Sequence, residues 1–169
     1  ILVCIKQVPD SDFDLVIEGK ITEKRHIAFN NGWQYDNIEF LVADAMALPF
    51  AASYFSTIAS INILEKVPDP MTHLTEINRL LRERDARFVF SDPFSWDTSV
   101  SSPDTWLSGL NQGRFKGRGV DNIAGIMQGM GDIIVPEMAI VEQRDVSWKI
   151  RKTQNLWEYI TSQMIVGKR

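Results

Sequence analysis

The sequence predicts an α/β domain whose sheet is mostly parallel and ends in an antiparallel hairpin. Two observations carry this prediction. Residues 57–90 show the succession of strand, helix and strand that forms a parallel βαβ unit with a right-handed crossover. Residues 137–169 then show two strands around the sequence KTQN, which favours their pairing as a hairpin at the end of the sheet.

The regular part of the chain begins with Ile38–Val42, which predicts a strand, and the sequence DAMALPF predicts a turn after it. The apolar run Thr57–Ile63 suits a buried parallel strand. Pro68–Pro70 then sets up a helix in MTHLTEINRLLRER, where apolar residues fall at helical spacing. Glu76 and the arginines are expected on the opposite face of this helix, and Phe88–Phe90 predicts the next strand.

A long irregular excursion is expected over Ser95–Gly119, which is rich in Ser, Pro, Gly and Trp and is suited to cover a pocket. Residues 121–130 predict a helix, with Asp121 as the candidate N-cap. Basic residues near the C-terminus alternate with apolar residues at strand spacing. We interpret them as a solvated strand face.

The N-terminal residues are less regular. The β-branched run Ile1–Val8 predicts a strand that ends at Pro9, and residues 13–17 predict a second short strand that ends at Glu18. Residues 20–36 mix polar and aromatic side chains without a clear period, so the sequence predicts no element there.

The length of 169 residues is close to the usual size of one domain, so we expect a single domain over residues 1–169. Within it, residues 1–37 are an atypical or truncated segment of strand and linker. Residues 38–169 are the regular core.

The composition argues against several function classes. A net charge of −4 and a pI near 5.2 do not favour a nucleic-acid surface. With one cysteine, Cys4, and two distant histidines, His26 and His73, we expect no disulfide within the chain and no metal site. Because no apolar run reaches the ~20 residues that span a bilayer, we expect a cytoplasmic protein that does not associate with membranes.

Residues 38–93, with the sequence IEFLVADAMALPFAASYFSTIASINILEKVPDPMTHLTEINRLLRERDARFVFSDP, resemble the central part of class I S-adenosylmethionine-dependent methyltransferases. In that family a strand ends in an acidic residue before LPF, and a later strand carries a sequence of the FVFSDP type. The tail is compatible with the hairpin that closes the family's sheet. The resemblance implies a Rossmann-like fold, S-adenosylmethionine as cofactor and a small-molecule acceptor.

The resemblance also implies site residues. Asp44 matches the carboxylate that accepts a hydrogen bond from the adenine amino group, a role that suits an acceptor-only side chain, and Ala45 supplies the adjacent backbone N–H. Ser60, Ile61 and Asn62 match the loop beside the methionine part of the cofactor. Glu18 is spaced from Asp44 as a ribose-binding acid would be, although Glu-Gly is also an ordinary turn sequence.

No catalytic residue is assigned. Where the family often has a pair that includes histidine, this chain has Glu65 and Lys66. Methyl transfer from a sulfonium is an in-line displacement, so it depends largely on how nucleophile and methyl group are held, with a base only where the acceptor must lose a proton. We expect Trp96, Trp106 and Phe115 either over the acceptor or as packing beneath the excursion.

The glycine-rich turn that follows the first strand in the family is absent, because PDSDFD follows Ile1–Val8. Residues 1–12, ILVCIKQVPDSD, instead resemble the start of the β subunit of electron-transfer flavoproteins. Three alternatives therefore stay open: a methyltransferase, impaired by the missing loop; a non-catalytic relic or interaction domain; and a flavoprotein-like nucleotide-binding fragment. A homo-oligomer is also left open.

Overall fold

The computed structural model describes residues 2–5, 41 and 43–169. The described residues 2–5 and 43–169 belong to one compact unit. The strand predicted over residues 13–17, the site candidate Glu18 and most of the strand predicted over residues 38–42 lie outside the described residues. The single domain over residues 1–169 therefore stays a prediction.

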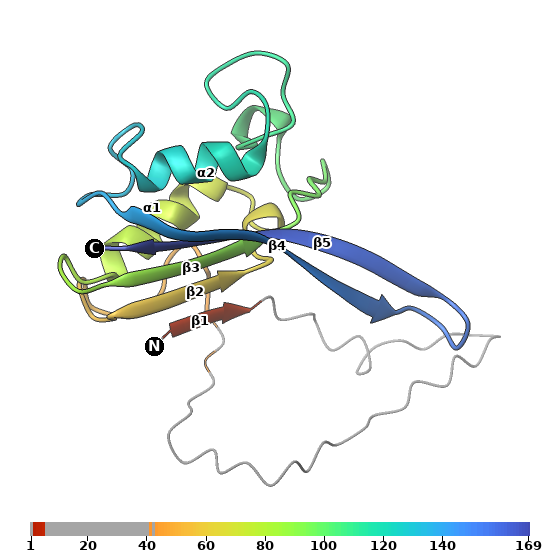
Figure 1. Cartoon of the computed structure of the whole chain (residues 1–169), viewed down its shortest axis with the longest axis horizontal. Helices are drawn as coiled ribbons and strands as arrows, with labels where there is room; N and C mark the ends of the chain where they lie inside the picture. Colours follow the sequence, from red (N-terminus) through yellow and green to blue (C-terminus); the bar gives the residue numbers. More distant parts are fainter. Residues whose placement is uncertain (1, 6–40, 42) are drawn as a thin grey trace, which may run out of the picture. The chain divides into compact units, whose positions relative to one another are not determined.

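The sheet has five strands in the order β1-β2-β3-β5-β4 (Figure 1). The first three strands, β1 (Leu2–Ile5), β2 (Thr57–Ile61) and β3 (Arg87–Asp92), run parallel. The last two, β4 (Ala139–Arg151) and β5 (Trp157–Lys168), pair antiparallel with each other, and β5 pairs antiparallel with β3. The prediction of a mostly parallel sheet is not confirmed, because the hairpin adds two antiparallel pairings and the sheet is mixed.

Helix α1 (Pro70–Leu80) follows β2, as the helical spacing predicts. Asp69 caps it, since its Oδ1 accepts hydrogen bonds from the backbone N–H groups of Met71 and Thr72 at 3.0 and 3.1 Å. The predicted helix extends too far, because Leu81 is already extended backbone.

Helix α2 (Gly119–Met127) begins before the predicted start. The prediction that Asp121 is its N-cap is wrong. Arg118 occupies that position without a capping side-chain hydrogen bond, and Asp121 lies in the first turn at 3.9 Å from the Arg118 guanidinium. The acidic side chain still lies favourably near the positive end of the helix dipole.

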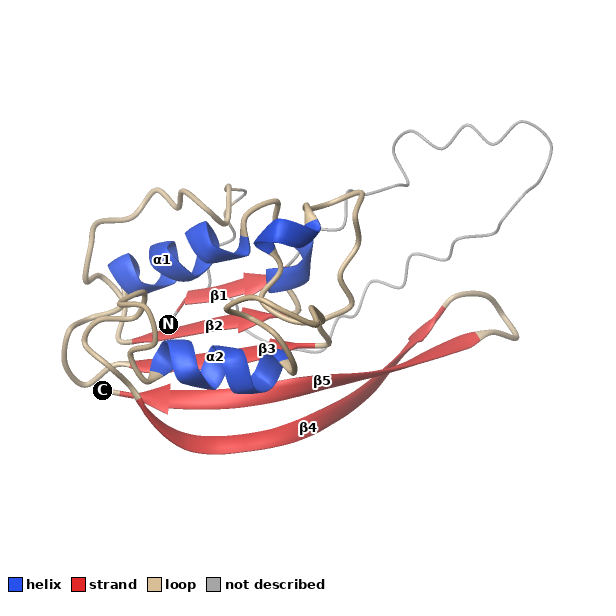
Figure 2. Ribbon diagram, turned by 90° about the horizontal axis from the view of Figure 1, so that it is seen from above, coloured by secondary structure: helices blue, strands red, loops and turns tan. Residues whose placement is uncertain are grey.

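Both helices cover the same face of the sheet (Figures 1 and 2). The core between helices and sheet is formed by large apolar side chains that are fully buried, among them Ile58, Leu74, Ile77, Phe88, Phe90, Ile123, Ile126 and Ile165. The register explains this layer, because Ile58 pairs with Phe88 and Phe90 with Ile165. Alternate residues of each strand therefore point to the helices.

An irregular excursion follows β3, with one short 3-10 helix, η2 (Pro103–Thr105). The rings of Trp96 and Trp106 stack there with centroids 5.9 Å apart. Each indole N–H donates to a serine hydroxyl, Trp96 to Ser108 at 2.7 Å and Trp106 to Ser101 at 3.0 Å. These two tryptophans pack against each other within the excursion.

The hairpin extends beyond the rest of the sheet (Figure 2). β3 pairs with β5 as far as Asp92 opposite Gln163, whereas β4 and β5 stay paired out to Arg151 opposite Trp157. On the extension, the Lys149 ammonium and the Arg151 guanidinium lie 4.9 and 5.6 Å from the centroid of the exposed Trp157 ring. Lys149, Arg151, Lys152 and Lys168 are exposed, as expected for a solvated strand face. Arg169 departs from this expectation, because it is half-buried and donates to the carbonyls of Pro136 and Arg82, both at 2.9 Å.

In the part of the chain that the structure describes, no helix has the length and apolar character needed to cross a membrane.

Candidate functional site

The carboxyl ends of the three parallel strands meet at one edge of the sheet, where open α/β sheets usually bind ligands. Ile5 of β1 lies opposite Ile61 of β2, and Ile61 lies opposite Ser91 of β3. The backbone N–H of Asn62 also donates to the Ser91 carbonyl at 2.7 Å. Residues 60–62, which the resemblance assigns to the site, therefore lie at this edge.

Asp44 lies in a tight turn that its own side chain stabilises. Its Oδ1 accepts a hydrogen bond from the Met46 N–H at 2.8 Å, and its carbonyl accepts one from the Ala47 N–H at 3.1 Å. This is the Asx-turn arrangement in which a carboxylate replaces a backbone acceptor. Asp44 is exposed, so its carboxylate stays accessible from solvent.

His73 of α1 joins this turn to β2. Its Nδ1 lies 2.9 Å from the Ala45 carbonyl oxygen and its Nε2 lies 2.9 Å from the Ser60 hydroxyl. A carbonyl only accepts, so Nδ1 carries the proton, and in the neutral ring Nε2 accepts from Ser60. The imidazole is fully buried, and this burial lowers the pKa of His73, although the Ala45 hydrogen bond and the nearby Glu76 charge act in the opposite direction.

Glu76 and Arg79 hold the rest of the segment that follows Asp44. Glu76 accepts from the Leu48 N–H at 2.8 Å and forms two hydrogen bonds with the Arg79 guanidinium at 2.6 and 2.7 Å. Arg79 also donates to the carbonyls of Leu48 and Phe50 at 3.0 and 2.8 Å. The Arg79 hydrogen bonds are the main reason that the pKa of Glu76 lies below its usual value.

The prediction that Glu76 lies on the face opposite the apolar residues is wrong, because Glu76 is buried. Its partner Leu48 lies 28 residues earlier, so helical spacing alone does not show the contact. Only the pairing of Glu76 with Arg79 at the i, i+3 spacing is visible in the sequence.

The structure gives the other predicted residues distinct surroundings. Ser60 is fully buried, and its hydroxyl is bonded to His73 rather than free for a ligand. Ile61, half-buried, points to the other face of the sheet. Asn62 has a left-handed backbone (φ 55°), and its Oδ1 accepts from the Ser162 hydroxyl at 2.9 Å. Glu18 lies outside the described residues.

Sequence reasoning did not identify Asp92, at the end of β3, as a site residue. Asp92 is fully buried; its Oδ1 accepts from the Phe94 N–H at 2.8 Å, while its Oδ2 has no hydrogen-bond partner among the described residues. Burial, and secondly the charge of Glu65, raise the pKa of Asp92 to about 7, although backbone N–H groups of Phe94, Glu65 and Leu64 oppose the shift. A buried carboxyl group of this kind, at the edge where open α/β sheets usually bind ligands, is a candidate functional group.

Glu65 and Lys66, which replace the family's histidine-containing pair, are engaged with each other. The Lys66 ammonium lies 2.7 Å from Glu65 Oε1, and Glu65 also accepts from the Ser95 N–H. The pair fixes the start of the excursion after β3.

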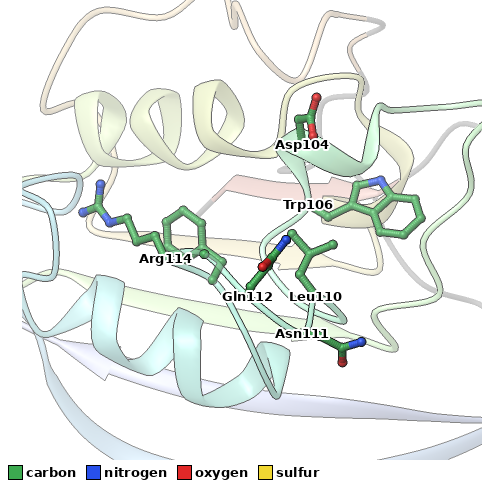
Figure 3. A pocket seen from close by; sticks show the side chains of 8 residues that line it. Asp104, Trp106, Leu110, Asn111, Gln112 and Arg114 are labelled. Atoms are coloured by element: carbon green, nitrogen blue, oxygen red, sulfur yellow. The ribbon is translucent and has the colours of Figure 1, made fainter.

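The excursion contains a hollow of about 620 Å³ (Figure 3). Trp106, Leu110 and Phe115 give it apolar walls, and four polar side chains and a glycine complete the lining: Asp104, Asn111, Gln112, Gly113 and Arg114. Of the aromatic residues that the sequence assigns to this region, Trp106 and Phe115 line the hollow and Trp96 stacks against Trp106.

Comparison with protein families gives one match: residues 18–89 match the model of a family described as methyltransferase domain. The match begins before residues 38–93, which carry the resemblance in the sequence. No curated protein matches the chain. None of the comparisons supports the resemblance of residues 1–12 to electron-transfer flavoproteins.

Several solved structures are similar to the chain. One is from work on the conversion of a disulfide bond into a thioacetal group during echinomycin biosynthesis (15% identity, 77% of this chain, 55% of that chain, TM-score 0.49). Another is an S-adenosylmethionine-dependent methyltransferase from Methanosarcina mazei (17% identity, 78% of this chain, 66% of that chain, TM-score 0.49). A third is a complex of the Haloferax volcanii Trm112 methyltransferase activator with a methyltransferase (16% identity, 82% of this chain, 64% of that chain, TM-score 0.49).

The chain thus spans between about half and two thirds of the length of these proteins. The family match over residues 18–89 supports a domain of the methyltransferase type, with S-adenosylmethionine as its cofactor.

Proposed function

We propose that the chain transfers a methyl group from S-adenosylmethionine to a small-molecule acceptor at the carboxyl edge of β1, β2 and β3. The observation that carries the proposal is the position of Ala45 and Ser60 on the two sides of one buried imidazole, that of His73. This contact fixes the Asp44 turn beside the end of β2, so the two sequence segments that the resemblance assigns to the cofactor are neighbours.

The residues at this edge suit the cofactor in part. The Asp44 carboxylate is exposed and acceptor-only, as the amino group of an adenine requires. Asn62, with its Oδ1 bonded to Ser162, still has an amide NH2 group that can donate. The Ser60 side chain supports the turn from inside, because its hydroxyl is bonded to His73.

When bound, the cofactor supplies an electrophilic methyl group, and the protein's part is to hold the acceptor in line with it. The hollow in the excursion is our candidate for the acceptor, because this excursion starts at the carboxyl end of β3. Its walls combine apolar rings with amide and charged side chains, a mixture typical of small-molecule sites.

A second candidate is a non-catalytic domain that keeps the sheet but not the activity. It is favoured by the sequence between β1 and Glu18, which has no glycine and therefore no glycine-rich turn for the cofactor's carboxylate. The same feature favours an impaired rather than an efficient enzyme.

Calorimetric titration with S-adenosylhomocysteine, the demethylated product, tests the proposal first. Binding with a 1:1 stoichiometry supports it, and absence of heat at millimolar concentrations rejects it. A screen of small-molecule acceptors with radiolabelled S-adenosylmethionine then separates the two candidates. Labelled product supports methyl transfer, whereas binding without product supports the non-catalytic domain.

A further inference from the structure

We infer that His73 is a positioning residue that orients the Asp44 carboxylate through a single peptide group. The inference rests on the proposed function and adds to it a residue that does not contact the cofactor. It is carried by the hydrogen bonds on the two ends of the peptide between Ala45 and Met46.

The carbonyl end of this peptide accepts from Nδ1–H of His73 at 2.9 Å. The N–H end donates to Oδ1 of Asp44 at 2.8 Å. A peptide group is planar, with its carbonyl oxygen and amide hydrogen pointing in opposite directions. Rotation of this plane therefore moves both hydrogen bonds together, and the imidazole fixes the direction in which the carboxylate is held.

The imidazole is itself well fixed. It is fully buried, and Ser60 of β2 holds Nε2 at 2.9 Å from its hydroxyl oxygen. The imidazole therefore holds the Asp44 turn at a fixed position relative to β2. Glu76 and Arg79 anchor the later residues Leu48 and Phe50 but make no hydrogen bond to the peptide of Ala45.

Two substitutions separate the two ends of the imidazole. In His73→Asn the side-chain amide nitrogen can take the place of Nδ1 and donate to Ala45, whereas in His73→Gln the amide group lies nearer the place of Nε2 and Ser60. Both variants lose the ring and one hydrogen bond, so a purely structural role predicts similar losses of thermal stability and similar affinities.

The test measures the dissociation constant for S-adenosylhomocysteine by calorimetry, with the exchange rate of the Met46 amide in ligand-free protein as a second readout. We expect His73→Gln to bind about tenfold more weakly than wild type, equivalent to about 1.4 kcal/mol, and to exchange Met46 faster. We expect His73→Asn to bind within about threefold of wild type, since the donor to Ala45 is retained.

Equal affinities and equal Met46 exchange rates in the two variants would overturn the inference while leaving the proposed function in place. Failure of the wild-type chain to bind S-adenosylhomocysteine would instead reject the proposed function, and the inference with it.

Discussion

Nε2 of His73 lies 2.9 Å from the hydroxyl oxygen of Ser60, so a hydrogen bond joins helix α1 to strand β2 inside the core. Both nitrogens of the ring are used, because Nδ1 donates to Ala45. The site therefore depends on a neutral histidine at a position where the sequence shows only an isolated residue within a helix.

The first prediction concerns pH. Burial lowers the pKa of His73 below its usual 6.5, so at acidic pH the unfolded chain binds a proton that the folded chain does not bind. The free energy of unfolding should therefore fall as the pH drops below about 6.5. Urea denaturation of wild type and His73→Asn between pH 5 and pH 8 checks this. The difference between the two should change with pH, and a constant difference would contradict the prediction.

The second prediction concerns Asp92, whose pKa of about 7 in the folded chain lies above its unfolded value of 3.8. Between these values the folded chain binds more protons, so this group contributes stability at low pH that is lost as the pH rises through 7. Asp92→Asn removes the buried charge and should stabilise the protein at pH 8 by about 1–4 kcal/mol, the order of a shift of this size.

Thermal denaturation at pH 5 and pH 8 measures the effect of Asp92→Asn. The melting temperature of the variant should exceed that of wild type by more at pH 8 than at pH 5. An equal loss at both values would show that the carboxylate is better satisfied than its surroundings indicate.

The third prediction tests the proposed adenine contact. Asp44→Ala should weaken binding of S-adenosylhomocysteine by about 1–3 kcal/mol, the cost of leaving a polar group without its partner. Asp97→Ala is the matched control, since Asp97 forms the same kind of turn, with its Oδ1 2.8 Å from the Ser99 N–H. An unchanged affinity in Asp44→Ala, measured by calorimetry, would remove Asp44 from the site.

The fourth prediction concerns the Arg79 clamp, by which we mean the hydrogen bonds of Arg79 to Glu76, Leu48 and Phe50. Arg79→Ala removes the hydrogen bonds to Glu76, Leu48 and Phe50 and should lower the free energy of unfolding by about 1–3 kcal/mol. Arg118→Ala is the control, because it breaks only the exposed ion pair with Asp121 at 3.9 Å. It should change the free energy of unfolding by less than about 0.5 kcal/mol. Equal effects in urea denaturation would show that the clamp adds nothing beyond a surface charge.

Local patterns in the sequence predicted the elements that depend on local chemistry. The apolar spacing around Leu74 and Ile77 predicted α1, and the strand pattern around KTQN predicted the hairpin. The extent of α2 was missed because its first turn, from Gly119, lacks the usual capping side chain. The share of parallel pairing was overestimated because the antiparallel pairing of β3 with β5 joins residues that lie far apart in the sequence, which local patterns do not show.

The candidate site was predictable only in part. The Asp44 turn and the end of β2 could be located by resemblance, but their connection through His73 depends on contacts 13 and 28 residues apart in sequence. Asp92 gave no signal either, because its raised pKa arises from burial and from the nearby Glu65 charge, which depend on the folded arrangement.

Among the strands that the structure describes, the hairpin extension past Gln163 pairs only within itself, and its connecting residues 152–156 are exposed. Exposed loop tips of this kind accept added residues with little cost to the core. A fluorescent label or a short affinity peptide placed between Thr153 and Asn155 should therefore leave the Asp44 turn undisturbed, which makes this tip a convenient attachment point for binding studies.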